Sequence, residues 1–494
     1  MRLRGSDVEL KEAVERFLEL GYHLSPEALE LVVEEGVQSY LELVKRIRPP
    51  EPVLTREMLL DLREGPSGKV QERGEAPRAG PGGRESEGYE ADVVVEKVAE
   101  VKPIKGEVEE FVRYFRSRLE LLLNVLRERV PNILLPSQVG GREGETVTVA
   151  GLVREKISLR GGGLRVVIED FSSQLAVIIP PENVAAVRIG ERLLLDQVAA
   201  FRGRMGSRGL RAEAIVYPDV PAGYRPNAAD VPLEAALISD VHVGSSYFIR
   251  ELFDRFLEWL RGPEGGRVKY LIICGDLVDG VGIYPGQEEE LDIPDIYKQY
   301  EEAARLLSEV PDDVIVIYIP GNHEPVRQAE PQPQIPREYA EPILEARDEV
   351  YMLTNPSVIR LNGVRFLLYH GRSLNAVFKY VPGLQPPTRE TVVTAMSELL
   401  RVRHLAPIYG EHPILPSDRD QLVIDVIPDV IHMGHVHVYG AGTYRNVRVV
   451  NSGTFQGETP YIRGLGITPT PGIVPVVRLD TLEVREVDLR NWGG

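Results

Sequence analysis

Five short motifs rich in histidine and carboxylate side chains lie in the second half of the chain, each directly after an aliphatic run. In chain order they are Asp240-Val-His242, Gly275-Asp276-Leu-Val-Asp279, Gly321-Asn322-His323-Glu324, His370-Gly371 and Gly434-His435-Val-His437. Five of the nine histidines of the chain fall within them. A single Asp or Asn after a strand is usually a turn former. Five such motifs in series indicate instead that their side chains share one site.

The mixture of Asp, Asn and His indicates what the site would bind. Such ligands, converging from several loops, suit borderline divalent metals such as Mn, Fe or Zn. None of the motifs contains cysteine, which argues against a structural zinc site. Two ions ~3.5–4 Å apart, bridged by one carboxylate, lower the pKa of a bound water and clamp a phosphate. The sequence therefore predicts a two-metal phosphoesterase site.

The spacing within the first and last motifs predicts their geometry. Asp240 and His242 are two residues apart, and so are His435 and His437. Side chains two residues apart on an extended segment point to the same face. We therefore expect both pairs to reach the site from extended backbone.

The elements around these motifs predict an α/β domain over residues 231–487. Buried strands are expected in LEAALISD, VKYLIICGD, DDVIVIYIP, GVRFLLYH and PDVIHMGHVH. Helical segments, near 248–261 and 294–310, separate the first three. In such a layered domain, the loops at the strand ends carry the functional side chains.

The first half of the chain divides into four further parts. Residues 1–47 predict a small helical interaction module, in which Ser6-x-x-Glu9 caps one helix and Ser25-Pro26 begins another. Residues 48–106 predict a disordered linker, since Gly, Pro, Glu and Arg dominate between 63 and 90. Residues 107–130 predict a connecting helix. Short strands over 131–220, among them ERLLLD at 191–196, predict a β-barrel of the OB-fold type.

Composition limits the partners and the location. The net charge of −18 over 494 residues argues against nucleic-acid binding by bulk electrostatics, although a local basic groove is compatible with it. The single cysteine, Cys274, fits a reducing compartment and is expected to be buried. No apolar run is long enough to span a membrane. We expect a cytoplasmic protein without a membrane partner.

The ordered set of motifs resembles the calcineurin-like metallophosphoesterase superfamily from about residue 233 to 487. This resemblance implies a phosphoesterase sandwich, preceded here by the expected barrel and helical module. It also implies two divalent metal ions, with manganese the first choice for activity and iron or zinc as alternatives. The first metal would take Asp240, His242, Asp276 and His437. The second would share Asp276 and add Asn322, His370 and His435.

The same resemblance implies that His323 is the general acid and not a ligand. Glu324 stands where many nucleases of the superfamily have Asp, and we expect it to hold His323 through a hydrogen bond. Asp279 is expected either to cap the following helix or to support the ligands from behind. The remaining histidines, His23, His404, His412 and His432, belong to no motif and are expected to be structural or exposed.

A closer resemblance covers most of the chain from about residue 107 to the end. LISDVHVGS, GDLVDG, RVRHLAPIYGEHPILP and VIDVIPDVIHMGHVH, together with the order of the predicted parts, resemble the small subunits of archaeal D-family DNA polymerases. That resemblance implies a 3′–5′ proofreading exonuclease that acts on DNA 3′ ends. It also implies a large catalytic polymerase subunit as partner.

Two alternatives come from other functional classes. A purely structural accessory subunit is one, because related eukaryotic polymerase subunits of this architecture have lost metal ligands; here all seven positions are filled. A phosphoesterase for a phosphoprotein or a small nucleotide is the other. Protein phosphatases of the superfamily carry Arg before the GNHE motif, whereas Pro320 stands there in this chain.

Overall fold

The computed structural model describes residues 83–492 apart from 101 and 103, and before them only part of the stretch between 14 and 59. The chain divides into two compact units, residues 1–78 and 79–494. In the first unit, helix α2 (Pro26–Glu35) begins where the sequence predicts, and the Ala28 amide donates to Ser25 Oγ at 3.2 Å. Strand β1 (His23–Leu24) pairs with β2 (Val53–Leu54). The helix expected after Ser6 lies almost entirely outside the described residues.

The second unit contains a sheet that is mainly parallel. Its order is β13-β12-β11-β10-β19-β20, where β10, β11, β12 and β13 run parallel. The bounds are β10 Glu234–Ile238, β11 Val268–Cys274, β12 Ile315–Ile319, β13 Val350–Met352, β19 Ile473–Arg478 and β20 Val484–Asp488. Every residue of β10, β11 and β12 is buried, as expected of parallel strands covered on both faces.

A second six-stranded sheet packs against the first. Its order is β17-β18-β16-β15-β14-β3. The bounds are β3 Val93–Val98, β14 Ser357–Leu361, β15 Val364–Leu368, β16 Val430–Met433, β17 Tyr439–Tyr444 and β18 Val447–Ser452. Side chains such as Ile272, Ile317 and Phe366 form the core between the two sheets. The five strands expected in this half of the chain are confirmed.

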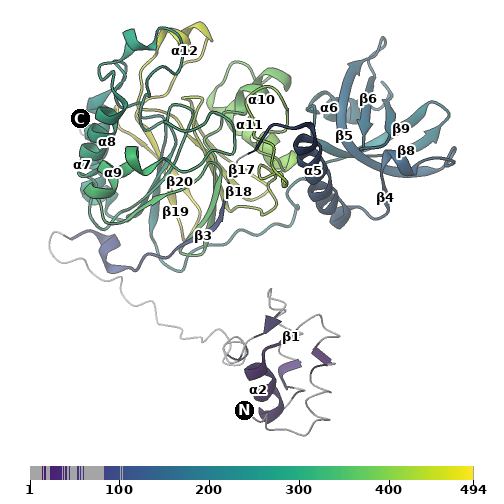
Figure 1. Ribbon diagram of the computed structural model, residues 1–494, viewed down its shortest axis with the longest axis horizontal. Helices are drawn as coiled ribbons and strands as arrows, with labels where there is room; N and C mark the ends of the chain where they lie inside the picture. The colour runs from purple at the N-terminus through teal and green to yellow at the C-terminus, as the bar shows by residue number, and fades with distance from the viewer. Residues whose placement is uncertain are drawn as a thin grey trace. The chain divides into compact units, whose positions relative to one another are not determined.

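Strand β3 corrects the prediction of disorder over 48–106. Residues 83–100 are ordered, and β3 forms the edge of the second sheet by pairing with β14 (Figure 1). Its run of valines supplies the pattern of a half-buried strand, which the polar composition of the preceding stretch concealed. Glu96 adds ion pairs to Arg360 and to Arg365. Residues 60–82 lie outside the described residues.

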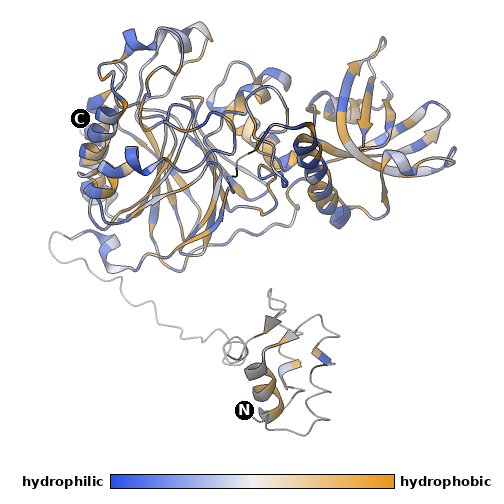
Figure 2. Ribbon diagram, in the orientation of Figure 1, coloured by the Kyte–Doolittle hydropathy of each residue, from blue (hydrophilic) through white to orange (hydrophobic). Residues whose placement is uncertain are grey.

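Helices cover the outer faces of the two sheets. The bounds are α7 Arg250–Arg261, α8 Ile296–Leu307, α9 Arg337–Ala346, α10 Leu374–Tyr380, α11 Arg389–Val402 and α12 Pro460–Gly464. The aromatic face of α7 packs on the first sheet, with Phe253, Phe256 and Trp259 fully buried. Burial of a side chain of this size contributes about 1.5–3 kcal/mol. The apolar strands inside and the polar outer helix faces are visible in Figure 2.

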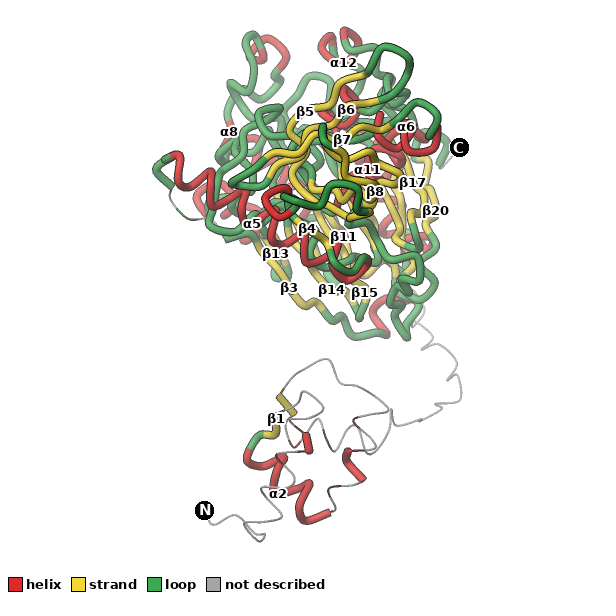
Figure 3. Tube along the Cα trace, turned by 90° about the vertical axis from the view of Figure 1, so that its right-hand side faces the viewer, coloured by secondary structure: helices red, strands yellow, loops and turns green. Residues whose placement is uncertain are grey.

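A closed five-stranded barrel completes the second unit. It lies beside the sandwich in Figure 1 and in front of it in the turned view of Figure 3. Its strands are β5 Thr146–Ser158, β6 Leu164–Glu169, β7 Gln174–Ile179, β8 Val198–Gly206 and β9 Gly209–Val216, and the pairing of β5 with β8 closes it. Helix α6 (Val184–Glu191) stands between β7 and β8, and the short β4 (Ile133–Leu134) lies beside β5. The strand predicted at 191–196 is wrong: after α6, the buried Leu193 and Leu194 lie in irregular backbone, and the next strand of the barrel is β8.

Helix α5 (Val108–Arg129) connects the barrel to the sandwich, and its prediction is confirmed. Leu119, Leu122 and Leu126 pack on barrel residues. Short 3₁₀ turns complete the described part: η1 Glu85–Gly88, η2 Pro136–Gln138, η3 Pro263–Gly265 and η4 Gln287–Glu290. Among the described helices, none is both long and apolar enough to cross a membrane.

Candidate metal centre

The five motifs meet because they follow strands whose ends lie together. Asp240, Asp276 and Asn322 follow the parallel strands β10, β11 and β12 of the first sheet. His370 and His435 follow β15 and β16, which are parallel neighbours in the second sheet. The carboxyl ends of parallel strands form the usual ligand site of open α/β sheets.

The backbone at these motifs is not extended, so the geometric argument made from spacing is wrong. Five of the candidate ligands have a positive φ, a conformation that costs energy for residues other than glycine. These are Asp240 (51°), His242 (56°), Asp276 (53°), His435 (71°) and His437 (58°). Tight left-handed turns, and not strand parity, bring the side chains to the same place.

Two glycines make the close approach of these turns possible. A Cβ atom at Gly321 would overlap Asp276 Oδ1, and one at Gly434 would overlap Asp240 Oδ2 and the Ser239 hydroxyl. Neither neighbour is the free end of a flexible side chain, since both aspartates are buried. Glycine is therefore required at both positions for the candidate ligands to lie as they do.

One group of candidate ligands consists of Asp240, His242 and His437. Asp240 Oδ1 lies 3.4 Å from His437 Nε2 and 4.0 Å from His242 Nε2, and the two histidine nitrogens are 3.1 Å apart. Asp240 Oδ1 is buried and has no hydrogen-bond partner within the described part of the chain. A buried carboxylate oxygen without a donor is costly, and a cation would remove that cost.

A second group consists of Asp276, His370 and His435, whose ligand atoms all lie within 4.8 Å of one another. His370 Nε2 lies 3.2 Å from Asp276 Oδ2 and 3.1 Å from Asn322 Oδ1. His370 Nδ1–H donates to the Cys274 carbonyl at 2.9 Å, which leaves the Nε2 lone pair directed at two oxygen atoms. The four side chains therefore fit a divalent cation.

The electrostatics agree with that fit. Burial alone would lower the pKa of His370, but the carboxylates of Asp276 and Asp240 outweigh it and raise the pKa to about 10. Buried negative charge and hydrogen bonds to these groups together stabilise the proton. Bound cations would take over that role.

Asp279 supports the ligands from behind, which was one of the two expectations for it. Its Oδ1 accepts from His242 Nδ1 at 2.8 Å, and its carboxylate also accepts from Gln287 and Gln456. A carboxylate in this position fixes the ring and leaves Nε2 of His242 free to bind a metal. The glutamines that hold Asp279 belong to no motif, and the sequence offered no signal for them.

Glu324 does not hold His323, contrary to expectation. Its carboxylate accepts from the amides of Asp276 (3.0 Å), Leu277 (2.8 Å) and Gly321 (2.7 Å) and from the Tyr318 hydroxyl (2.5 Å). The side chain thus points beneath the turn that carries Asp276. It fixes the turns of two motifs relative to each other.

His323 lies at the edge of the cluster, and the Asp279 main chain orients it. Its Nδ1–H donates to the Asp279 carbonyl at 2.6 Å, so Nε2 is the ring nitrogen that remains available to carry a transferable proton. Burial alone would lower its pKa, yet the nearby Asp276 and Asp279 raise it above the ordinary value. A protonated imidazole with one fixed nitrogen suits a proton donor.

The cluster forms the floor of a cleft of about 520 Å³. Arg372, Asn375, Tyr461 and Leu465 also line it, and the sequence analysis missed all four. Asn375 Nδ2 lies 2.9 Å from His435 Nε2, so it positions that ring. Arg372 could have been noticed, because it follows the His370-Gly371 motif directly.

The remaining histidines that the structure describes are structural, as expected. His404 pairs with Asp420 at 2.8 Å, His412 with Glu330 at 3.0 Å, and His432 with the Ser452 hydroxyl at 3.0 Å. The side chain of His23 lies outside the described part.

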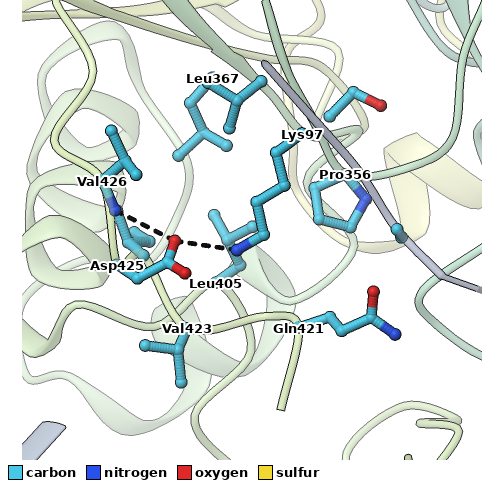
Figure 4. Close-up of a pocket in the computed structure, with 12 residues that line it drawn as sticks. Lys97, Pro356, Leu367, Leu405, Gln421, Val423, Asp425 and Val426 are labelled. Carbon is cyan, nitrogen blue, oxygen red and sulfur yellow. Dashed lines mark hydrogen bonds and ion pairs between the residues drawn. The ribbon is translucent and has the colours of Figure 1, made fainter. Parts of the chain in front are cut away.

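A second hollow lies beside β3, away from the cluster. Lys97 reaches across it to Asp425 at 2.8 Å, between apolar side chains such as Leu367 and Val423 (Figure 4). None of the described residues that line it is a histidine. It is therefore no candidate for phosphoester chemistry.

Comparison with known proteins gives relatives along nearly the whole chain. A family model for the B subunits of DNA polymerases alpha and epsilon matches residues 235–439. The DNA polymerase II small subunit of Archaeoglobus fulgidus is 36% identical over 490 residues, which cover 96% of each chain. That of Pyrococcus furiosus is 45% identical over 404 residues, covering 78% of this chain but only 64% of the relative. Among solved structures, Vps29 of Entamoeba histolytica with Zn²⁺ matches 52% of this chain at 14% identity, with a TM-score of 0.26.

Proposed function

This chain belongs to the family of archaeal DNA polymerase II small subunits, and from that premise we propose that it is a 3′–5′ exonuclease of DNA. The observation that carries the proposal is the complete cluster: Asp240, His242 and His437 form one group, Asp276, His370 and His435 the other, and Asn322 completes the second. A non-catalytic scaffold would have no need to bury this many charged and strained side chains.

Seven residues would hold two divalent ions. Asp240, His242 and His437 would hold one ion, Asn322, His370 and His435 would hold the other, and Asp276 would contribute to both. Divalent ions bound there supply Lewis acidity toward a phosphate oxygen. We propose manganese as the metal that occupies these sites in the cell.

The protein residues have separate tasks in phosphodiester hydrolysis. A water attacks phosphorus, and the bond from phosphorus to the 3′ oxygen of the preceding nucleotide breaks. His323 donates a proton from Nε2 to that departing oxygen, while its Nδ1–H stays bound to the Asp279 carbonyl. The products are a 5′-mononucleotide and a strand with a new 3′ hydroxyl.

The proposal also covers the fold of the barrel and the partner of the chain. The sheet order β5-β6-β7-β9-β8, closed on β5, and the position of α6 between β7 and β8 in the sequence support an OB-fold over 131–220. The small-subunit family supports a large catalytic polymerase subunit as partner of the barrel and of the sandwich, 231–487. The module over 1–47 is proposed to serve interaction.

The test is digestion of a DNA oligonucleotide labelled at its 5′ end, with added Mn²⁺ and with the large subunit present. We expect a ladder of shortening labelled products, since cleavage starts at the unlabelled 3′ end. Asp276→Ala should abolish it, and Asp418→Ala, an exposed carboxylate paired with Arg113, should not. Metal-loaded protein that leaves the oligonucleotide intact would refute the proposal.

A further inference from the structure

The cleft above the cluster has a polar floor but apolar walls. Two separate segments supply these walls: Ile283, Tyr284 and Pro285 from the loop after β11, and the stretch 461–467 in and after α12. Nothing in phosphate chemistry requires aromatic side chains there. A cleft of this size accommodates a small organic ligand, so the walls have room to contact more than a phosphate.

The wall residues are unusually exposed for their size. Tyr461 is 66% exposed, Leu465 53% and Tyr284 36%. Within the described part of the chain, the Tyr461 ring neither stacks on another ring nor makes a hydrogen bond. Large apolar surface left open beside a polar site usually marks a contact surface.

The exposed side chains are nevertheless held in place. The Ile462 amide donates to Thr459 Oγ1 at 3.2 Å, and Ile462 and Thr459 are both buried, so the backbone that carries Tyr461 is fixed. The Tyr284 hydroxyl donates to Glu290 at 2.9 Å, which restrains the second ring. Rings presented on fixed backbone lose little entropy when a flat ligand stacks on them.

Away from the two ions proposed for its floor, the cleft offers little positive charge to a polyanion. Among the described residues that line it, Arg372 is the one whose side chain is permanently positive. Its Nη1 donates to the Gln328 carbonyl and to Gln328 Oε1, both at 3.0 Å. The chain as a whole carries −18. Beyond the phosphate that the ions would hold, electrostatic contacts would therefore bind a nucleic-acid strand weakly.

We propose that Tyr461, with Leu465 beside it, and Tyr284 form a base-stacking subsite that holds an unpaired 3′-terminal segment over the cluster. This inference rests on the proposed exonuclease function. Every base has a flat face, so stacking on aromatic side chains grips any sequence. A base inside a duplex already stacks on its neighbours and must leave them first, which favours a frayed or mismatched end.

The experiment compares two single-stranded oligonucleotides, one normal and one whose last two nucleotides lack bases. Both keep the same phosphodiester bonds and the same charge. Stacking on one ring contributes enough that Tyr461→Ala should raise KM for the normal strand roughly 5- to 150-fold. It should leave KM for the abasic strand, and kcat for both, within about twofold of the wild type.

Three further variants make the result specific. Tyr461→Phe keeps the ring and should behave like the wild type, whereas Tyr284→Ala should reproduce the defect. Tyr297→Ala is the matched control, because Tyr297 is 51% exposed but stacks on Tyr339 outside the cleft. Equal effects of Tyr461→Ala on both strands, or no effect on either, would overturn the subsite while leaving the exonuclease intact. A wild type that cleaves neither strand would refute the exonuclease itself.

Discussion

His323 and Asp276 are neighbours in the cluster but have different partners. The Asp276 side chain lies against His370 and accepts from the His323 amide at 2.9 Å. The His323 ring is bound by Nδ1 to a main-chain carbonyl. The two side chains can therefore be removed separately, with different consequences for metal binding and for proton donation.

Asp276→Ala should lose metal and hydrolysis together, whereas His323→Ala should keep its metal. In the second variant the proton donor alone is missing, which typically costs ~10²–10⁴ in rate. The loss should shrink with a p-nitrophenolate leaving group, because that group needs no proton. Metal analysis beside single-turnover rates on both substrate types checks this. If His323→Ala lost metal, or was equally slow on both substrates, His323 would not be the acid.

The residue types of the cluster could be predicted from the sequence, but their backbone could not. Asp, Asn and His in series reveal metal chemistry because few other tasks need that mixture. Positive φ at Asp240 or His437 leaves no trace in the sequence, because the surrounding fold imposes it. Glu324 was misread for a related reason: a single residue name does not tell which of several nearby donors its carboxylate meets.

At the scale of elements, a buried polar network fastens α5 to the sandwich. The fully buried Arg118 of α5 donates to Asp420 at 2.7 Å and to the Pro407 carbonyl at 2.6 Å. His404 donates to the same carboxylate from Nε2 and accepts the Ala406 amide at Nδ1. Both ring nitrogens of the neutral His404 are therefore used. A second proton would have to bind Nδ1, which already accepts the Ala406 amide.

This network should make the attachment of α5 sensitive to acid. Burial, and then the charge of Arg118, lower the pKa of His404 to about 4. Between pH ~6.5 and that value the unfolded chain binds a proton that the folded chain does not, so stability falls as the pH falls. The neutral His404 contributes about 3 kcal/mol to the free energy of unfolding above pH ~6.5, and this contribution is lost as the pH falls to ~4.

Hydrogen exchange of the segment around His404, measured without metal between pH 4 and 7.5, checks this prediction. His404→Gln can keep both hydrogen bonds but cannot titrate, so protection in that variant should change less with pH than in the wild type. An identical pH dependence in the two proteins would show that His404 does not control the attachment.

The sequence revealed elements where one pattern dominated and missed them where two patterns competed. Strands β10, β11 and β12 are mostly apolar runs that are buried throughout, and their assignment was straightforward. The stretch 191–196 also has consecutive leucines, but it follows α6, and the buried Leu193 and Leu194 lie in irregular backbone. Strand β3 was hidden because its partner lies in a distant part of the sequence.

At the scale of the whole molecule, we expect a stable complex with the large polymerase subunit. A barrel joined to the sandwich through α5 has no evident role in a free-standing phosphoesterase, and it offers a second surface to a partner. Co-expression followed by size-exclusion chromatography checks this. Separate elution of the two subunits at micromolar concentration would count against the proposed partnership.

A second expectation concerns truncation within the second unit. Residues 79–494 contain the entire cluster and should keep hydrolysis, because all seven candidate ligands come from this unit. Residues 104–494 keep α5 and the barrel but lose β3, which uncovers the backbone edge of β14 and the side chains it packs on. Such an edge pairs readily with other chains. Light scattering should therefore show aggregation of the shorter fragment only, and equal solubility of both would contradict the role given to β3.

The position of β3 also sets an order of events during synthesis. Val98 pairs with Ser357, so the whole barrel and half of the sandwich leave the ribosome between the two strands. At ordinary translation speed that interval is on the order of tens of seconds, long enough for a small barrel to fold first. During that interval the valine-rich strand β3 has no β14 to pair with. The nascent chain thus has a folded barrel and an unpaired strand at the same time. A chaperone that binds residues 93–98 would protect this strand from pairing with other chains.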